Sequence, residues 1–286
     1  MNEITLKTFA KINLTLSVFE KCGNLHKIDG VMSSVDLYDT VRVILRGDDK
    51  VTVSCSVELS GENTAKRAAE AVKSRFGTGG VDIIIKKSIP VGAGLGGSSA
   101  DAAAVFRAME SLFRVKTEPA MQAAIGSDVP FMYRGGVARV GGTGEVISPL
   151  PYKKFECLLA VPPVMALAGG VYSKYDELGG ENADTDAFIE NWRSEGAAAA
   201  VKLGKNALER AALADDRLRA YFDKINQKIK DLGVDADVRL TGSGSGILIF
   251  SQNPHFLKEA MAENVENIYF RVLKSVDFGV KVLNMA

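Results

Sequence analysis

The sequence predicts an α+β fold in two lobes. Segments with strand patterns and segments with helix patterns are mixed in both halves of the chain, which is typical of antiparallel pairing. A chain of 286 residues is long enough to bury a large core and is more often divided into two lobes than built as one. We place the division after residue 152, so that residues 1–152 form the first lobe and residues 153–286 the second.

Strands dominate the start of the chain. Residues 12–19 alternate apolar and polar side chains, as a half-buried strand does. Residues 41–45 and 51–57 follow the same pattern, and the turn-forming sequence at 47–50 predicts that these two segments pair as a hairpin.

A helix and an apolar strand come next. Residues 64–76 have a helical pattern that Gly77 ends, and Asn63 is suited to cap the first turn. Residues 81–86 predict a short apolar strand, which leads into the most informative segment of the chain.

That segment is a glycine-rich loop at residues 90–97, where five of the eight residues are proline or glycine. A helix is predicted from Ser98 to about residue 113. The first amides of a helix have no internal partner and its amino end carries partial positive charge. Glycines let further amides approach an anion closely. Strand, glycine loop and helix start together predict a phosphate-binding loop.

Other readings of the loop are open. Gly92 to Gly97 satisfy the dinucleotide pattern G-x-G-x-x-G, but residues 88–91 separate the strand from the first glycine and no buried strand follows the helix. The Walker pattern is absent because Ser98 follows Gly97 where a lysine is required. The third reading is a glycine-rich surface loop without a ligand.

The remaining elements continue the mixed pattern. Residues 120–125 form a short segment, residues 137–140 and 157–161 predict strands, and residues 169–186 are expected to be a loop-rich connection. The second lobe is predicted to contain helices at 207–213, 218–232 and 256–265, a hairpin-like pair at 238–240 and 247–250, and a strand at 269–273.

Composition narrows the class of protein. Lysine plus arginine equals aspartate plus glutamate at 35 each, which argues against a nucleic-acid partner. No apolar run is long enough to span a bilayer, and the start of the chain shows no signal peptide, so we expect no membrane association. Three scattered cysteines suggest neither disulfides nor zinc, and a cytoplasmic location is the expectation.

Three motifs in this order resemble the GHMP kinase superfamily. Residues 90–103 resemble its central motif P-x-G-x-G-L-G-S-S-A, residues 10–13 read Ala-Lys-Ile-Asn, and residues 241–246 form a second glycine loop. The resemblance covers nearly the whole chain. It implies a two-lobed kinase with an N-terminal nucleotide-binding lobe and a C-terminal ferredoxin-like α/β lobe.

One branch of the superfamily is nearest. Residues 10–14, 37–39 and 126–131 match the branch that phosphorylates the 2-hydroxyl of a cytidine diphosphate polyol in the non-mevalonate isoprenoid pathway. The resemblance implies ATP and Mg²⁺ as cofactors and a small-molecule substrate, in a monomer or homodimer. The alternatives are another GHMP kinase acting on mevalonate or homoserine, a catalytically silent metabolite sensor, and an oxidoreductase that uses the same glycines.

The resemblance also assigns the catalytic pair. Asp128 is the expected base, because a carboxylate within hydrogen-bond reach of the acceptor hydroxyl can take its proton. Lys11 is expected beside Asp128, where a cation keeps the carboxylate ionised and stabilises charge on the attacking oxygen. From the residues alone, Asp128 is better explained as an ordinary turn residue, as most loop aspartates are.

Ligand contacts follow from the same motifs. Ser99 is expected to reach magnesium through a water, although Ser98 and Ser99 could simply cap a helix. Leu25 stands where the branch carries an aromatic residue before the histidine that holds the cytosine ring, and leucine offers apolar contact without ring stacking. The expected nucleotide contacts are Pro90, Val91, Gly92, Ala93, Gly94, Leu95, Gly96, Gly97, Ser98, Ser99 and Asn63, and the expected substrate contacts are Asn13, Leu25, His26, Asp128, Gly242 and Ser243.

Overall fold

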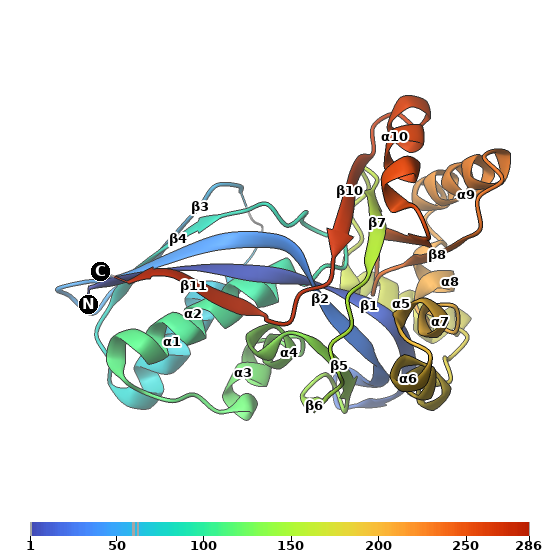
Figure 1. Cartoon of the computed structure of the whole chain (residues 1–286). Helices are drawn as coiled ribbons and strands as arrows, with labels where there is room; N and C mark the ends of the chain where they lie inside the picture. Colours follow the sequence, from blue (N-terminus) through green and yellow to red (C-terminus); the bar gives the residue numbers. More distant parts are fainter. Residues whose placement is uncertain (1, 59–60, 62, 286) are drawn as a thin grey trace.

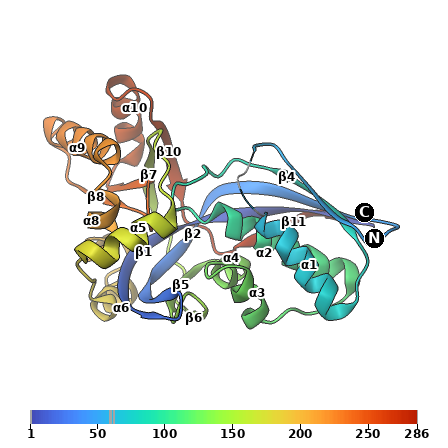
Figure 2. The same ribbon diagram turned by 180° about the vertical axis from the view of Figure 1, so that it is seen from behind.

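The computed structural model describes residues 2–58, 61 and 63–285 and contains two β-sheets (Figure 1). The first sheet has the strand order β11-β1-β2-β4-β3, with β5 paired to β2 and β6 to β5. Its members are β1 (Glu3–Cys22), β2 (Leu25–Leu45), β3 (Val51–Cys55), β4 (Val81–Lys86), β5 (Val137–Gly141), β6 (Val146–Pro149) and β11 (Val280–Met285). Four helices cover one face of this sheet, with α3 packed on the other three rather than on the strands (Figure 2). They are α1 (Thr64–Phe76), α2 (Gly97–Phe113), α3 (Pro119–Ile125) and α4 (Val129–Arg134).

The second lobe has the ferredoxin-like topology that the family resemblance implies. Its sheet has the order β10-β7-β9-β8, with every neighbouring pair antiparallel. Helices separate the first strand from the second and the third strand from the fourth, as in a β-α-β-β-α-β unit. The strands are β7 (Glu156–Val161), β8 (Ala236–Leu240), β9 (Ile247–Ser251) and β10 (Tyr269–Lys274). The helices are α5 (Ala168–Leu178), α6 (Thr185–Ser194), α7 (Ala197–Val201), α8 (Glu209–Ala212), α9 (Asp216–Asp231) and α10 (Pro254–Asn264).

β1 joins the two lobes. Its polar residues Asn13, Thr15 and Ser17, expected to face water as the exposed half of an alternating strand, are buried together with the apolar ones. Ser17 Oγ donates to the carbonyl of Ala183 and accepts from its amide, and the amide of Asn13 donates to Thr241 Oγ1. The alternation of apolar and polar residues in β1 therefore reflects two different buried faces. The apolar side chains pack in the core, and the hydroxyls of Thr15 and Ser17 bond to the second lobe.

The hairpin predicted for residues 41–57 is wrong. β4 lies between the two segments, antiparallel to β2 and parallel to β3. The chain leaves β3, crosses through α1 and returns as β4 beside it, which is a β-α-β unit. The turn at 47–50 instead hydrogen-bonds to the chain at the start of β4. The carbonyl of Asp48 accepts from the amide of Gly80, and the carbonyl of Lys50 accepts from the amide of Val81.

The loop-rich connection predicted for residues 169–186 is also wrong. Residues 168–178 form α5, and α6 begins at Thr185. The pair Gly169 and Gly170 suggested a loop, but Val171, Tyr172 and Tyr175 pack inward and hold the segment as a helix. The expected helix at 207–213 is present only as the short α8.

The end of the chain returns to the first sheet. β11 pairs with β1, and both ends of the chain lie at the outer end of the first lobe (Figure 1). The division of the chain after residue 152 remains a prediction. If it is correct, residues 153–286 also supply one strand, β11, to the sheet of the first lobe. Among the described residues, no helix is long and apolar enough to cross a bilayer.

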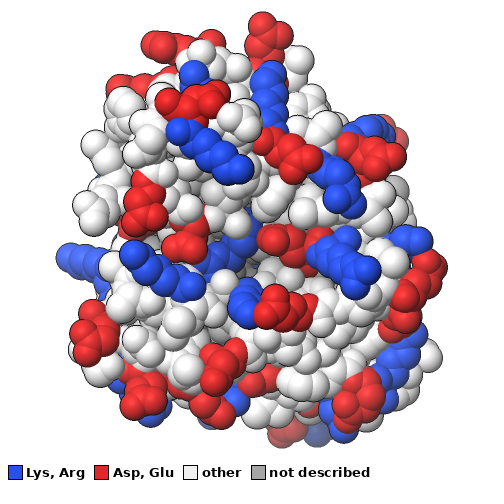
Figure 3. All heavy atoms as spheres, turned by 90° about the vertical axis from the view of Figure 1, so that its right-hand side faces the viewer, with Lys and Arg blue, Asp and Glu red and all other residues white. Residues whose placement is uncertain are grey.

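The face that carries the second lobe shows no large patch of one charge (Figure 3). Lysine and arginine side chains alternate with aspartate and glutamate across this view.

Candidate active site

A cleft of about 730 Å³ lies where the lobes meet. β1, the glycine loop, the first turn of α2, the loop before α4, α5 and the second glycine loop all contribute to its walls. The cleft brings together every residue singled out from the sequence: Lys11, Asn13, Leu25, His26, Asn63, Pro90, Val91, Gly92, Ala93, Gly94, Leu95, Gly96, Gly97, Ser98, Ser99, Asp128, Gly242 and Ser243. Their shared location is a finding, and their individual roles remain predictions.

The glycine loop is held by its carbonyls. Gly92 O accepts from the amides of Ala166 and Ser245, Ala93 O from Gly246, and Leu95 O from Lys11. The first bond of α2 runs from the amide of Ala100 to Gly96 O, so the amides that precede it lie outside the helical ladder. With its carbonyls turned to the protein and its helix start at the cleft, this loop is suited to bind an anion.

Gly94 is where the two glycine loops touch. Its φ is +71°, and a Cβ added there would lie 2.1 Å from the carbonyl oxygen of Thr241. Only glycine fits such a close approach in that backbone conformation. The loop of the first lobe is therefore packed directly on the loop of the second.

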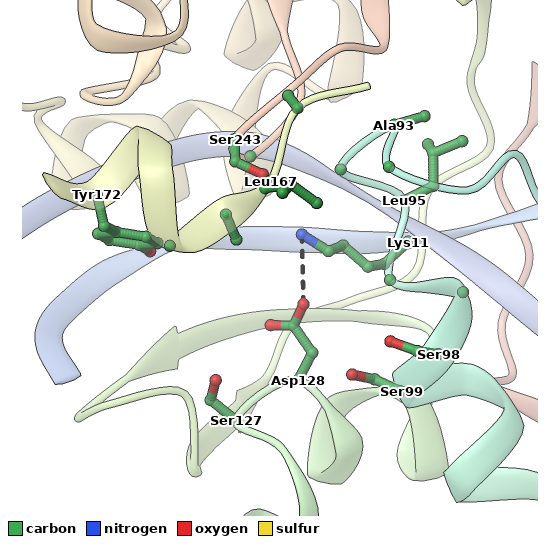
Figure 4. A pocket seen from close by; sticks show the side chains of 18 of the residues that line it. Lys11, Ala93, Leu95, Ser98, Ser99, Ser127, Asp128, Leu167, Tyr172 and Ser243 are labelled. Carbon is green, nitrogen blue, oxygen red and sulfur yellow. Dashed lines mark ion pairs between the residues drawn. The ribbon is translucent and has the colours of Figure 1, made fainter. Parts of the chain in front are cut away.

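The two serines after the loop do not cap the helix. Gly96 is the N-cap residue of α2 and no side chain makes a capping bond there. Ser98 and Ser99 lie in the first turn, and their side chains extend toward the region of Asp128 (Figure 4). A Cβ added at Gly126 would lie 3.6 Å from Ser99 Oγ, which places this hydroxyl against the loop that carries Asp128.

Lys11 and Asp128 face each other across the cleft. Lys11 Nζ lies 3.6 Å from Asp128 Oδ2 and donates to Asn13 Oδ1 at 2.7 Å (Figure 4). Lys11 is buried, whereas 27% of the Asp128 side chain is exposed. Asp128 precedes α4 but its side chain makes no capping bond, so its carboxylate is not occupied by the turn. A partly exposed carboxylate beside a buried ammonium group is suited to proton transfer.

His26 belongs to an aromatic cluster at the other end of the cleft. Its ring stacks on Tyr172 of α5, with centroids 5.1 Å apart, and meets the edge of Tyr175 at 6.0 Å. His26 Nε2 lies 2.7 Å from Asp176 Oδ1. Leu25 is half exposed beside this cluster. The site thus has an aromatic wall, which α5 supplies.

Two residues that line the cleft, Tyr172 and Asp176, were not predicted from the sequence. Burial raises the pKa of Tyr172, and the nearby charge of Asp128 adds to the shift. Hydrogen bonds from Lys21 and then His26 lower the pKa of Asp176. The helical spacing of Val171, Tyr172 and Tyr175 is the signal for this helix in the sequence, and the loop predicted for residues 169–186 does not take it into account.

Asn63 does cap α1, as predicted. Its side chain accepts from the amide of Ala65 at 2.9 Å, and Gly77 ends the helix in the left-handed conformation. Asn63 also lines the cleft, so capping leaves its amide group available at the wall of the site. A contact with nucleotide remains a prediction.

The dinucleotide reading of the loop is excluded by the topology. After α2 the chain passes through α3 and α4 into β5, which pairs antiparallel with β2. The dinucleotide fold requires a strand parallel to and near the first one at this point.

The chain is similar to known proteins along most of its length. Residues 63–136 match the model of the GHMP kinases N terminal domain. A 4-diphosphocytidyl-2-C-methyl-D-erythritol kinase of Brevibacillus brevis is 34% identical over 98% of this chain and 96% of its own length. The kinase of the same name from Desulfitobacterium hafniense is 32% identical over 94% of this chain and 92% of its own length.

Solved structures give the same fold. A crystal structure of 4-(cytidine 5'-diphospho)-2C-methyl-D-erythritol kinase superposes with a TM-score of 0.76 at 26% identity, covering 95% of this chain and 99% of its own. A homoserine kinase from Cytophaga hutchinsonii superposes with a TM-score of 0.73 at 18% identity, covering 99% of this chain and 98% of its own, which supports the fold alone.

Proposed function

Because this chain belongs to the 4-diphosphocytidyl-2-C-methyl-D-erythritol kinases of the GHMP kinase family, we propose that it transfers the terminal phosphoryl group of ATP to the 2-hydroxyl of 4-diphosphocytidyl-2-C-methyl-D-erythritol. The reaction belongs to the non-mevalonate route to isoprenoids. We place the protein in the cytoplasm and expect a monomer or homodimer.

The main support is the position of Asp128 relative to the glycine loop. Phosphoryl transfer needs a held triphosphate and an oriented hydroxyl rather than extensive covalent chemistry. The amides at the start of α2 would hold the phosphates, and Asp128 faces them across the cleft. Asp128 takes the proton of the acceptor hydroxyl while the oxygen of that hydroxyl attacks the terminal phosphorus of ATP and ADP leaves.

Lys11 supports both partners of that step. Its ammonium group lies between Asp128 and Asn13, where it favours the ionised carboxylate and stabilises negative charge on the attacking oxygen. Asn13 in turn is held by Thr241 of the second lobe. The geometry of this pair argues against a silent sensor, which has no need of a base and a cation at this point.

The Ser99 hydroxyl is suited to hold a magnesium ion through a water. Magnesium usually keeps several of its waters and binds substrate phosphates. Ser99 lies in the first turn of α2 at the wall of the cleft, beside the loop that would hold the phosphates. When bound, the ion would neutralise charge on the phosphates.

The aromatic end of the cleft supports a base-bearing substrate. The ring of His26 can bond a pyrimidine through a ring nitrogen, and Tyr172 offers a stacking surface. Leu25 replaces an aromatic residue of the branch, and the α5 tyrosines supply rings beside it. Nothing of this kind is needed to bind mevalonate or homoserine.

The test is a coupled assay of ADP release with a panel of alcohols. We expect turnover with the cytidine diphosphate polyol, and a phosphorus NMR spectrum showing a new phosphomonoester at the 2-position. Turnover with mevalonate or homoserine in the absence of turnover with the cytidine compound would overturn the substrate assignment while leaving a GHMP kinase.

A further inference from the structure

A buried cluster of three charges, Asp39, Lys87 and Asp101, lies against the glycine loop, and Lys87 and Asp101 also line the cleft. The Lys87 ammonium group contacts Asp39 Oδ2 at 2.5 Å and Asp101 Oδ2 at 2.7 Å. At most 5% of any of these three side chains is exposed. No step of the proposed transfer uses them, and the sequence marked Asp39 only as part of a branch motif.

The cluster joins both ends of the loop. Asp39 Oδ1 of β2 accepts from the amides of Ser88 and Ile89, where the chain enters the loop. Asp101 lies on α2, one turn beyond the point where the chain leaves the loop. Lys87 bridges the two carboxylates, so one ammonium group ties the entry of the loop to its exit.

This arrangement is costly for the folded state. Two carboxylates share one cation in a place from which water is excluded, and Asp101 Oδ1 has no hydrogen-bond partner within the described part of the chain. Burial raises the pKa of Asp101 to about 7, and the repulsion from Asp39 adds to this while Lys87 opposes it. Strained electrostatics of this kind are concentrated at functional sites.

We propose that Asp39, Lys87 and Asp101 are positioning residues that set the spacing of the glycine loop for a nucleoside triphosphate. The inference rests on the proposed function only in assigning the triphosphate to this loop. Among the described residues, no hydrogen bond or ion pair joins the bridge to Lys11 or to His26. We therefore expect the affinity for ATP to depend on the bridge and the affinity for the acceptor to be independent of it.

The variant Asp101→Asn separates positioning from simple charge. It keeps the shape of the side chain and removes one negative charge from the cluster, which would by itself favour an anionic ligand. Positioning predicts the opposite, because a charge-assisted bond is about twice as strong as a neutral one and the hold on α2 is weakened. We expect the Kd for a non-hydrolysable ATP analogue to rise about fivefold, with the KM for the acceptor within twofold of wild type.

A second variant keeps the charge constant. Lys87→Gln combined with Asp101→Asn leaves Asp39 as the one charge, so at pH 8, where Asp101 of the wild type is mostly ionised, the net charge of the cluster stays at minus one. We expect the Kd for the analogue to rise about thirtyfold. Asp82→Asn is the matched control, because Asp82 lies on β4 before Lys87 and is paired with Arg46 at 2.6 Å, on the opposite end of that strand from the cleft.

Calorimetric titration of the analogue into each folded variant gives the answer. A Kd within twofold of wild type for both variants, or an equal rise in the acceptor KM, overturns the positioning role. Failure of the wild-type protein itself to bind the analogue overturns the proposed function instead, so the two outcomes are distinguishable.

Discussion

The pH dependence of stability in Asp101→Asn is the sharpest consequence of the buried charge cluster. Asp101 is buried and its pKa is about 7 in the folded protein, compared with 3.8 for the free side chain. The folded state therefore holds this proton more tightly than the unfolded state between these two pH values. The free energy of unfolding of the wild-type protein falls as pH rises through this range, because the unfolded chain releases the proton first.

The magnitude follows from the width of that range. Each pH unit is worth 1.36 kcal/mol, so ionising Asp101 costs the folded protein at most about 4 kcal/mol above pH 7. Asparagine cannot ionise and leaves Lys87 paired one to one with Asp39. We expect Asp101→Asn to be more stable than wild type at pH 8, with the difference about 3 kcal/mol smaller at pH 5.

Urea unfolding of both proteins at pH 5 and pH 8 measures this change. Titrating groups outside the Asp39, Lys87 and Asp101 cluster are shared, so their contributions cancel in the comparison between the two proteins. Parallel stability curves, or a variant that is less stable than wild type at pH 8, would refute the reasoning. A variant that gains stability while losing affinity for ATP would show that the carboxylate is retained for binding.

Three further predictions concern the cleft. Asp128→Asn should lower kcat by about a hundredfold or more in the ADP-release assay and leave ATP binding by calorimetry unchanged, as loss of a general base requires; near-normal turnover would remove Asp128 from that role. Gly94→Ala should cost at least about 2 kcal/mol of unfolding free energy, because its Cβ meets a backbone carbonyl, whereas Gly77→Ala, with the same sign of φ and open space around it, should cost about 1 kcal/mol; equal costs in thermal denaturation would contradict the close approach. Tyr172→Leu should raise the KM for the cytidine substrate about tenfold through loss of ring contact without changing the KM for ATP, and an unchanged substrate KM would place the base elsewhere.

Much of the site could be predicted because its parts are local in sequence. The glycine loop, the strand before it and the helix after it carry their signals within residues 81–113. Asn63 and Gly77 likewise set the ends of α1 through contacts a few residues away. Where an element depends on neighbours in the chain, propensity and capping chemistry were sufficient.

Pairing between distant strands could not be read in the same way. Residues 47–50 have the composition of a hairpin turn, yet β4 enters between the strands that this turn connects. The competing partner is more than twenty-five residues away and is brought in by α1. Turn chemistry reverses the direction of a chain, and it does not determine which strand fills the adjacent edge.

The missed helix α5 had a similar cause and a greater effect on the site. Gly169 and Gly170 lower helix propensity, and the acidic and aromatic residues that follow looked like a solvated connection. Tertiary packing overrides that propensity because Tyr175 OH donates to Val18 O and Tyr172 stacks on His26. The aromatic wall of the cleft therefore exists only once β1 and α5 have come together.

The two ends of the cleft differ in how they are built, and this difference explains the division of affinity that we expect between the two ligands. At the phosphate end, the glycine loop is held by backbone bonds from Ser245 and Gly246, by the contact of Gly94 with the second loop, and by the Lys87 bridge that lies against it. At the end where we propose that the acceptor binds, side chains of one helix stack on and bond to His26. Substitutions on α5 can therefore change the acceptor without disturbing the loop, because no bond of the loop passes through Tyr172 or Asp176. Lys11 is the link between the two ends, since its amide donates to Leu95 of the loop and its ammonium group faces Asp128.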